Sequence, residues 1–175
     1  EKVRRVSFDT TIVFTVAGTG DFGFTGDLGV ATSAAFREPY RAVADADGNF
    51  YVADAGNGRI RKIAAGTRIV TTVAGGGDGQ DGGPAVGAYL DFPADLAFDA
   101  AGNLYIAETY GGRIRKVDKA TGVISIVAGG GEQLGDGLPA TSANLDDPYG
   151  LVIGASGNIV IADTNHHRIR RVDAA

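Results

Sequence analysis

Residues 93–117 read PADLAFDAAGNLYIAETYGGRIRKV, and the chain states this stretch twice more with substitutions. The first copy, residues 39–63, reads PYRAVADADGNFYVADAGNGRIRKI, and the third, residues 148–172, reads PYGLVIGASGNIVIADTNHHRIRRV. The opening prolines lie 54 and 55 residues apart, and the Gly-Asn and Arg-Ile pairs keep these two intervals. A repeat of this length indicates one supersecondary unit that is stacked along the chain.

The pattern inside each repeat predicts four short strands. In the second copy they cover residues 95–99, 103–108, 113–117 and 123–128. These segments are rich in apolar and β-branched residues, and the turns between them contain Gly, Asn and Asp. No segment has helical periodicity, so each repeat is predicted to be a four-stranded antiparallel meander, with strands A to D. Residues 1–17 match strands C and D of such a unit.

Longer crossovers join the units at residues 18–38, 75–92 and 129–147. Each crossover has an Asp nine residues before an apolar residue, and we expect that apolar side chain to pack the crossover onto a neighbouring unit. The pairs are Asp27 and Phe36, Asp81 and Leu90, and Asp136 and Leu145. Pro84-Ala85 and residues 139–143 predict one helical turn in the second and third crossovers.

Composition limits the class of protein. The 175 residues include 28 Gly and 5 Pro, and 44% are hydrophobic, which is typical of a turn-rich folded domain. Without Cys there is no disulfide framework and no thiolate metal site. A net charge of −5 argues against broad binding to nucleic acid or anionic membranes. No apolar run approaches the length of about 18 residues that a membrane helix needs. The absence of Met leads us to expect a trimmed chain or an excerpt from a longer one.

The repeats resemble the blades of NHL-repeat β-propellers, in the subgroup found in bacterial multi-repeat proteins. The resemblance is carried by the opening prolines, the Gly-Asn pairs, Tyr51 and Tyr105, the acids Asp54 and Asp163, and the Arg-Ile pairs. It covers nearly the whole chain and implies an all-β propeller of four-stranded antiparallel blades. The implied blades are residues 39–74, 93–128 and 148–172, the last without strand D, preceded by the strands of residues 1–17.

Three blades do not close a ring, because propellers need about four to eight wedge-shaped sheets. The pattern predicts 13 strands, and two arrangements would shield the open faces. Two copies of the chain close into a six-bladed ring, with residues 11–17 of one copy completing the last blade of the other. Alternatively, further blades belong to a longer parent chain. In the dimer, residues 3–6 and 169–172 compete for one position, which favours the excerpt.

Residues that recur in every copy are explained by the fold. Asp54, Glu108 and Asp163 end strand B, and we expect them to accept turn N–H groups and to pair with Arg59, Arg113 and Arg168 at the start of strand C. Asp45-Ala-Asp47-Gly48-Asn49 resembles the start of a calcium loop, but the twelfth position is Gly56, so we predict a hairpin turn.

Residues that depart from the repeat are the candidate ligand-binding residues at the channel rim: Arg41, Asp95, Tyr110, Asn165 and His166. Arg41 and Asp95 replace the Gly that the family places two residues after the proline, and the simpler alternative is that they pair with each other. Tyr110 is unique to its turn and offers a ring for stacking. For His166 a solvated turn residue is the favoured interpretation, and a site shared with Asp163 is the alternative.

These observations favour a non-catalytic scaffold that binds a protein or small ligand at the channel rim, with no cofactor, no metal and no catalytic residue assigned. The alternative is a gluconolactonase-like or lyase-type propeller enzyme that holds a divalent metal in its channel. An RNA-binding propeller is a third option, and the acidic balance speaks against it.

Overall fold

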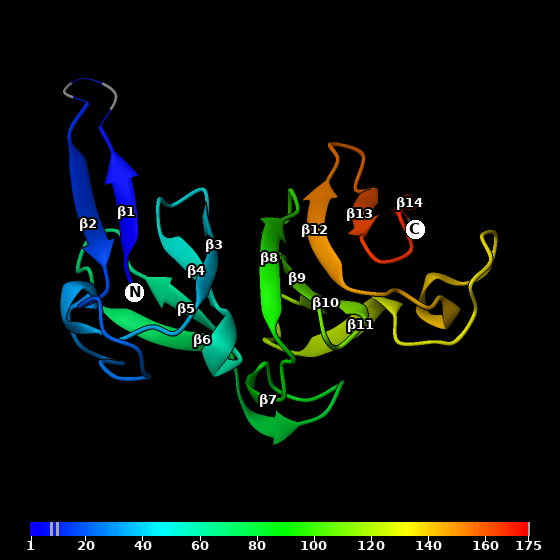
Figure 1. Cartoon of the computed structure of the whole chain (residues 1–175), viewed down its shortest axis with the longest axis horizontal. Helices are drawn as coiled ribbons and strands as arrows, with labels where there is room; N and C mark the ends of the chain where they lie inside the picture. Colours follow the sequence, from blue (N-terminus) through cyan, green and yellow to red (C-terminus); the bar gives the residue numbers. More distant parts are fainter. Residues whose placement is uncertain (8, 10, 175) are drawn as a thin grey trace.

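The computed structural model describes residues 1–7, 9 and 11–174, and this part of the chain is all-β, with fourteen strands in four sheets (Figure 1). The sheets stand side by side and do not close into a ring, so the chain is a partial propeller, as the sequence predicts. No helix in the described part has the length and apolar character needed to cross a membrane.

Each sheet follows the predicted meander. The front sheet pairs β1 (Val3–Val6) with β2 (Val13–Ala17). Blade 1 contains β3 (Pro39–Ala44), β4 (Phe50–Asp54), β5 (Arg59–Ile63) and β6 (Val70–Gly79), with β7 (Val86–Ala88) added beside β6. Blade 2 contains β8 (Pro93–Phe98), β9 (Leu104–Glu108), β10 (Arg113–Val117) and β11 (Ile124–Gly129). Blade 3 contains β12 (Pro148–Ile153), β13 (Ile159–Asp163) and β14 (Arg168–Val172).

The first strand of each blade is the innermost one. In Figure 1, β3, β8 and β12 stand next to one another, and β3 and β12 each contact β8. Strand order within blade 2 runs β8, β9, β10, β11 from the inside outward. Therefore the start of each innermost strand lies on the rim that also carries the crossovers and the B–C turns.

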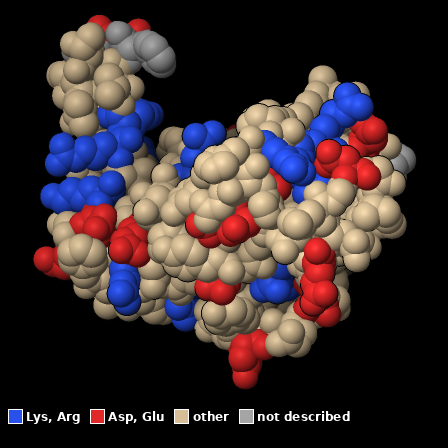
Figure 2. Space-filling model, turned by 45° about the vertical axis from the view of Figure 1, so that its right-hand side comes forward, with Lys and Arg blue, Asp and Glu red and all other residues tan. Residues whose placement is uncertain are grey.

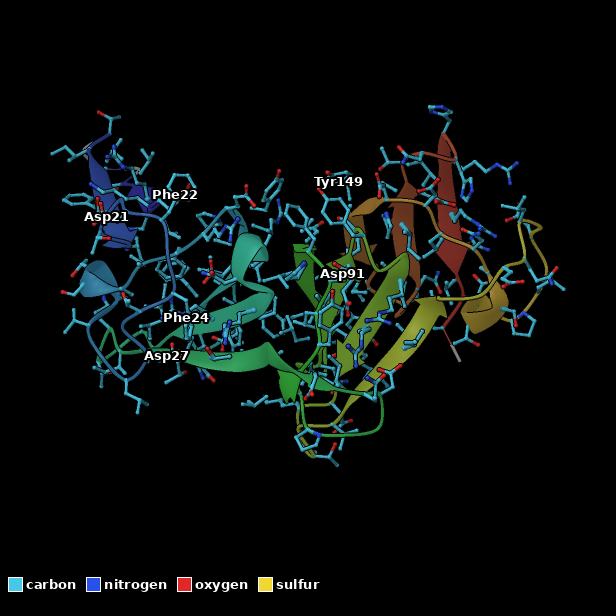
Figure 3. The ribbon with its side chains drawn as sticks, turned by 60° about the horizontal axis from the view of Figure 1, so that its bottom comes forward. Asp21, Phe22, Phe24, Asp27, Asp91 and Tyr149 are labelled. Carbon is cyan, nitrogen blue, oxygen red and sulfur yellow. The ribbon has the colours of Figure 1, made fainter. Side chains whose placement is uncertain are left out.

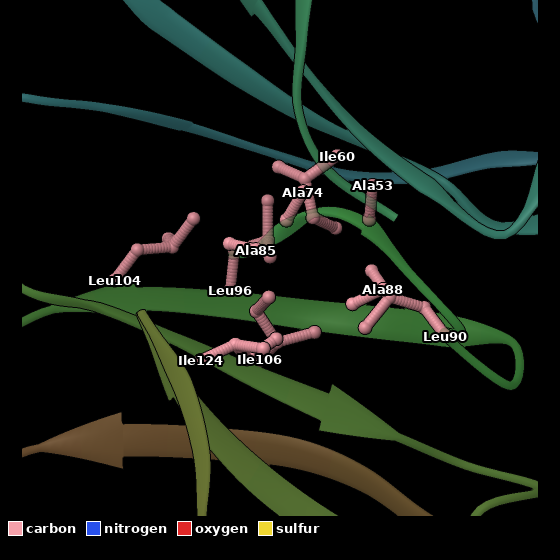
Figure 4. Close-up of a cluster of buried hydrophobic side chains, with 10 residues drawn as sticks. All are labelled: Ala53, Ile60, Ala74, Ala85, Ala88, Leu90, Leu96, Leu104, Ile106 and Ile124. Atoms are coloured by element: carbon pink, nitrogen blue, oxygen red, sulfur yellow. The ribbon is translucent and has the colours of Figure 1, made fainter. Parts of the chain in front are cut away.

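The blades are joined by apolar side chains that alternate along the second strand. In β9, Leu104 and Ile106 belong to the buried cluster shared with blade 1, which Figure 4 shows. Tyr105 and Ala107, one residue along, belong to the cluster shared with blade 3. This period of two follows from strand geometry, and it makes blade 2 a wedge that is buried on both faces.

The crossovers behave largely as predicted. Phe36, Leu90 and Leu145 are 0%, 4% and 5% exposed, which confirms that they pack onto the sheets. Short 3₁₀ turns occur at η1 (Ala31–Ser33), η2 (Ala55–Asn57) and η3 (Ala140–Ser142), and η3 confirms the turn predicted in the third crossover.

The helical turn predicted at Pro84-Ala85 is wrong, and with it the count of 13 strands. This segment leads into β7, which runs parallel to the end of β6. A Cβ on Gly77 would lie 2.3 Å from the carbonyl oxygen of Gly87, so the two backbones approach more closely than side chains allow. The glycine-rich sequence of residues 75–79 makes this extra pairing feasible.

The A–B turns of blades 1 and 2 are each closed by an Asp side chain. Asp99 accepts hydrogen bonds from the backbone N–H of Asn103 at 2.8 Å and from its Nδ2 at 2.7 Å. Burial alone raises the pKa of Asp99, but these bonds and the Tyr105 hydroxyl outweigh it and hold the pKa below its ordinary value. Asp45 makes the same bonds to Asn49, so the hairpin prediction for this segment is confirmed.

Candidate functional site

A fully buried acid ends the second strand of each blade. Asp54, Glu108 and Asp163 are 0% exposed, and each accepts a backbone N–H of the incoming crossover. The donors are Arg37 at 2.7 Å, Asp91 at 3.0 Å and Asp146 at 2.8 Å, respectively. These bonds fix the end of each crossover against the blade that follows it, as the predicted structural role requires.

The predicted arginine partners of these acids are largely wrong. Of the three first residues of strand C, only Arg113 contacts the acid, with Nη2 at 2.9 Å from Glu108 Oε2. Arg59 instead donates to the carbonyls of Asn57 and Gly76 and stacks on Phe24 at 3.9 Å from the ring centroid.

The third residue of strand C is the recurring partner. Arg61, Arg115 and Arg170 lie 3.7, 3.4 and 3.5 Å from the acids of their own blades. They also pair with the crossover acids Asp27, Asp81 and Asp136. Figure 3 shows Asp27 and Phe24 together on the first crossover, on the side of blade 1. Both members of each pair recur at the repeat interval, which is the sequence signal that identifies them.

His166 contacts the buried Asp163, in addition to the contacts that Asp163 makes with the Asp146 N–H and the Arg170 guanidinium. Its Nδ1 lies 3.0 Å from both carboxylate oxygens of Asp163, and its side chain is 23% exposed. The favoured expectation of a solvated turn residue is therefore wrong. The equivalent residue of blade 1, Asn57, donates to Asp54 Oδ2 at 2.9 Å, so His166 occupies a structural position of the repeat.

Burial and hydrogen bonding compete at Asp54. Burial raises its pKa, and this effect exceeds the opposite effects of the Asn57 amide, the Arg37 N–H and the Arg61 guanidinium. Asp54 is thus buried and has a crossover N–H, a turn amide and a guanidinium around its carboxylate, which is a structural role.

Arg41 and Asp95 pair with each other, which confirms the simpler alternative. Arg41 Nε lies 3.0 Å from Asp95 Oδ1, with side chains 55% and 12% exposed. Asp95 also accepts the backbone N–H of Leu96 at 2.8 Å and that of Leu151 at 2.9 Å. One carboxylate thus contacts blades 1, 2 and 3 where their innermost strands meet. We call these contacts of Asp95 with Arg41, Leu96 and Leu151 the Asp95 clamp.

On the same rim lies an aromatic cluster that the sequence indicated only through Tyr110. The Phe92 ring stacks on Tyr110 at 4.6 Å with an interplanar angle of 28° and meets Tyr40 edge to face at 5.1 Å. Tyr40 and Tyr110 are 54% and 61% exposed. Burial, followed by the electrostatic influence of Tyr110 and Tyr40, raises the pKa of Tyr149, a residue that is 39% exposed.

Asn165 lies in the turn of blade 3 that corresponds to Tyr110. Its Nδ2 donates to Asp147 at 2.9 Å and to Asp146 at 3.3 Å. It is held among the acids of the third crossover.

A groove of about 520 Å³ opens between blades 1 and 2 on this rim. Its lining includes the aromatic residues Tyr89, Phe92 and Tyr110 and four charged residues, together with Ala55, Asn57, Leu90, Gly56, Gly58, Gly76 and Gly77. The charged residues are Arg37, Glu38, Arg59 and Asp91. Figure 3 shows Asp91 over the strands of blade 2, away from the first crossover. We call this feature the aromatic groove.

Charge does not single out one sign of ligand. On the face drawn in Figure 2, acidic and basic side chains lie beside one another. In the described part of the chain, no group of three or more His, Cys, Asp or Glu side chains has a geometry that could hold a metal ion.

Comparisons with known proteins agree with this architecture. Residues 145–172 match the family described as NHL repeat. Over 134 residues the chain is 30% identical to NHL repeat-containing protein 2 of Bos taurus, an alignment that covers 70% of this chain and 18% of that protein. The chain thus spans less than a fifth of that relative's length.

Solved structures share the fold. A structural genomics protein of unknown function from Bacteroides thetaiotaomicron is similar with a TM-score of 0.72 at 23% identity, over 97% of this chain and 41% of that chain. An auxiliary nutrient binding protein from the same organism is similar with a TM-score of 0.70 at 18% identity, over 97% of this chain and 42% of that chain.

Proposed function

Since this chain belongs to the NHL-repeat family, with the fold of a partial β-propeller scaffold, we propose that it is a non-catalytic binding module whose ligand sits on the crossover rim. The observation that carries the proposal is the cluster of Tyr40, Phe92 and Tyr110, which leaves two tyrosines more than half exposed. Tyr and Arg concentrate at binding surfaces because they offer large, rigid contact area with a polar end. Arg41, more than half exposed beside Tyr40, adds a cation to the same rim.

The repeat itself does not require these aromatic residues. The positions equivalent to Tyr89, Phe92 and Tyr110 hold Ala35, Glu38 and Gly56 in the first copy and Asn144, Asp147 and Asn165 in the third. Strands A to C pair in the same antiparallel order in all three copies, so the aromatic side chains are not needed to build the blade. Phe92 moreover adopts a positive φ of 53°, a conformation that disfavours a bulky residue.

Screening the ¹⁵N-labelled chain against a mixture of small-molecule fragments by NMR tests the proposal. We expect shift changes to gather at the amides of Arg41, Phe92 and Tyr110. The opposite rim, where Asp47 and Lys119 line a pocket of about 280 Å³, is the internal comparison. Shifts that gather at that rim, and not at the aromatic cluster, contradict the proposal.

The metal-dependent enzyme remains the alternative, and it rests on Asp95. That carboxylate already accepts two backbone N–H groups and the Arg41 guanidinium, which supports a structural role. Metal analysis of the purified protein separates the two functions. A stoichiometric divalent metal that is lost on Asp95→Ala would favour the enzyme.

Closure of the ring stays a prediction. Apolar side chains on the outer sheets are exposed, among them Phe14 at 45%, Val152 at 63% and Ile169 at 73%. Such faces need further blades, from a second copy or from a longer parent chain. Light scattering of the 175-residue chain tests this: a particle of twice the chain mass supports self-association, and a soluble monodisperse monomer contradicts closure.

A further inference from the structure

We propose that the aromatic groove binds the sugar ring of a neutral oligosaccharide, an inference that rests on the proposed rim function and names its ligand class. The groove combines flat aromatic faces with unpaired hydrogen-bonding groups of both kinds. Its size, its aromatic wall, its charges and its backbone each fit such a ligand.

The groove has the size of a small-ligand site. Its volume of about 520 Å³ lies within the range of about 300–1,000 Å³ that is common for such sites. It is an open groove along the rim, which suits one ring of a longer chain whose neighbouring units continue into solvent.

The aromatic wall presents open ring surface. One face of Tyr110 is covered by Phe92, yet 61% of the residue is exposed, so the opposite face is free for a ligand. Tyr89 is 50% exposed on the same wall. The C–H groups on the face of a sugar ring pack on such surfaces, while its hydroxyl groups point outward from the ring edge.

The charged residues supply both hydrogen-bond donors and acceptors. Arg37 and Arg59 line the groove together with Glu38 and Asp91, and Arg59 already donates to the carbonyls of Asn57 and Gly76. Among the described residues, the side chains of Arg37, Glu38 and Asp91 take part in no ion pair. A guanidinium donates and a carboxylate accepts, and each sugar hydroxyl does both, so one neutral ligand satisfies both kinds of group.

Charged ligands fit this groove less well. An anion drawn to Arg37 also meets Glu38 and Asp91, and a cation drawn to those acids meets both arginines. An extended peptide uses a free strand edge or deep apolar pockets. The groove is lined mainly by crossover and turn residues, with Arg59 from the start of β5 and Gly76 and Gly77 from the end of β6, and its aliphatic members Ala55 and Leu90 are buried.

The left-handed backbone conformation at residue 92 gives no reason for a Phe at this position, which indicates that Phe92 is there for its side chain. Glu38, Phe92 and Asp147 hold the same place before the blade proline, with φ of 51°, 53° and 48°. The left-handed conformation costs an L residue about 1–2 kcal/mol and favours Gly, Asn or Asp. A Phe at this position therefore has no backbone advantage, and its stack under Tyr110 is the feature that it adds.

The test is a titration of the intact chain with cellohexaose, maltohexaose, mannohexaose and the neutral hexa-N-acetylchitohexaose, and with a mixture of hexapeptides as the competing class. Of the 6 Tyr, Tyr89 and Tyr110 line the groove, and the chain has no Trp, so binding there changes part of the tyrosine emission and the Tyr110 variants identify that part. We expect at least one hexasaccharide to change this emission, and calorimetry to give its affinity.

The variants locate the binding. Tyr110→Ala lowers the affinity about tenfold, the worth of one good ring stack. Tyr110→Phe keeps the stack and retains binding. Leu134→Ala, at an exposed residue of the third crossover outside the groove, changes the affinity by less than about twofold. Tyr110 is well exposed, so circular dichroism is expected to show that all three variants fold.

The outcomes separate the two proposals. Hexapeptide binding that depends on Tyr110, without sugar binding, overturns the sugar class and leaves the rim function standing. Sugar binding that Tyr110→Ala does not weaken overturns the groove. Failure of all four sugars at about 10 mM, a concentration that detects even very weak affinity, also overturns it. Absence of any ligand at the rim in the fragment screen removes both proposals.

Discussion

Asp95 is predicted to be the single side chain on which the contact between the three blades depends most. Its Oδ2 accepts the N–H of Leu151 in blade 3, and its Oδ1 accepts the N–H of Leu96 and faces Arg41 of blade 1. Asp95, Leu96 and Leu151 are buried, with 9%, 1% and 4% of each residue exposed. Replacing Asp95 with Ala leaves these buried donors without their acceptor.

The magnitude follows from burial. A buried N–H that loses its acceptor costs about 1–3 kcal/mol, and here two such groups are affected. The ion pair adds little, because the Arg41 side chain is 55% exposed and such pairs contribute about 0–1 kcal/mol. We therefore expect Asp95→Ala to lower the free energy of unfolding by about 2–5 kcal/mol, and Arg41→Ala by less than about 1 kcal/mol.

Urea unfolding followed by circular dichroism measures both changes, with an unchanged m value as the check that the transition is the same. Asp95→Asn distinguishes hydrogen bonding from charge, since its single side-chain oxygen serves one N–H and its amide faces the other. It is expected to recover only part of the loss. Equal destabilisation by Arg41→Ala and Asp95→Ala would refute the clamp, because the ion pair alone would then explain the effect.

Three further predictions concern the repeat itself. Gly129→Ala should lower the free energy of unfolding by about 2 kcal/mol or more, because its Cβ would lie 2.3 Å from a carbonyl oxygen. Gly122→Ala, also at positive φ but with open space around it, should lower it by about 1 kcal/mol. Equal losses of the two variants in thermal unfolding would contradict a steric cause. Because the pKa of Asp99 is lowered in the folded chain, its ionised carboxylate contributes stability above its ordinary pKa, and this stability is lost as the pH falls through the folded value. The urea midpoint should therefore drop less between pH about 5 and about 3 in Asp99→Asn than in the parent. The same dependence of the midpoint on pH in both proteins would exclude this role. His166→Asn should stay within about 0.5 kcal/mol of the parent, whereas His166→Ala should cost about 1–2 kcal/mol by removing a partner of buried Asp163; a large loss in the Asn variant would assign the ring a role beyond this bond.

The fold could be predicted from the sequence because each strand carries its own local signal. Alternation in residues such as Leu104, Tyr105 and Ile106 specifies a strand that is buried on both faces, and the Gly-Asn pair of each A–B turn specifies the hairpin. Repetition then gives the blade count without any long-range information. The pairing of β7 could not be predicted, because it depends on two glycine-rich backbones that meet across a crossover.

The site was only partly predictable, since its members come from different blades. Arg41, Asp95 and Tyr110 were identified because they depart from the repeat, and the first two form the pair that was the simpler expectation. Phe92 was missed, although Glu38 and Asp147 at its equivalent positions mark it as a departure too. It lies in a crossover, where no strand pattern sets an expectation, and its stack forms only because that crossover meets the turn of Tyr110.

The B–C turn of blade 3 differs from the other two at its left-handed position. Gly58 and Gly112 adopt φ of 57° in their B–C turns, where a Cβ would lie 2.9 and 2.7 Å from the carbonyl oxygens of Leu90 and Leu145 in the next crossover. The equivalent residue of blade 3 is His167, which keeps the same conformation at φ 54° and carries a Cβ. A crossover beyond blade 3 cannot approach this turn as closely as the other two do, because that Cβ occupies the space. Any blade that completes the ring on this side, from a second copy or a longer chain, must therefore be joined by a wider contact than those between blades 1, 2 and 3.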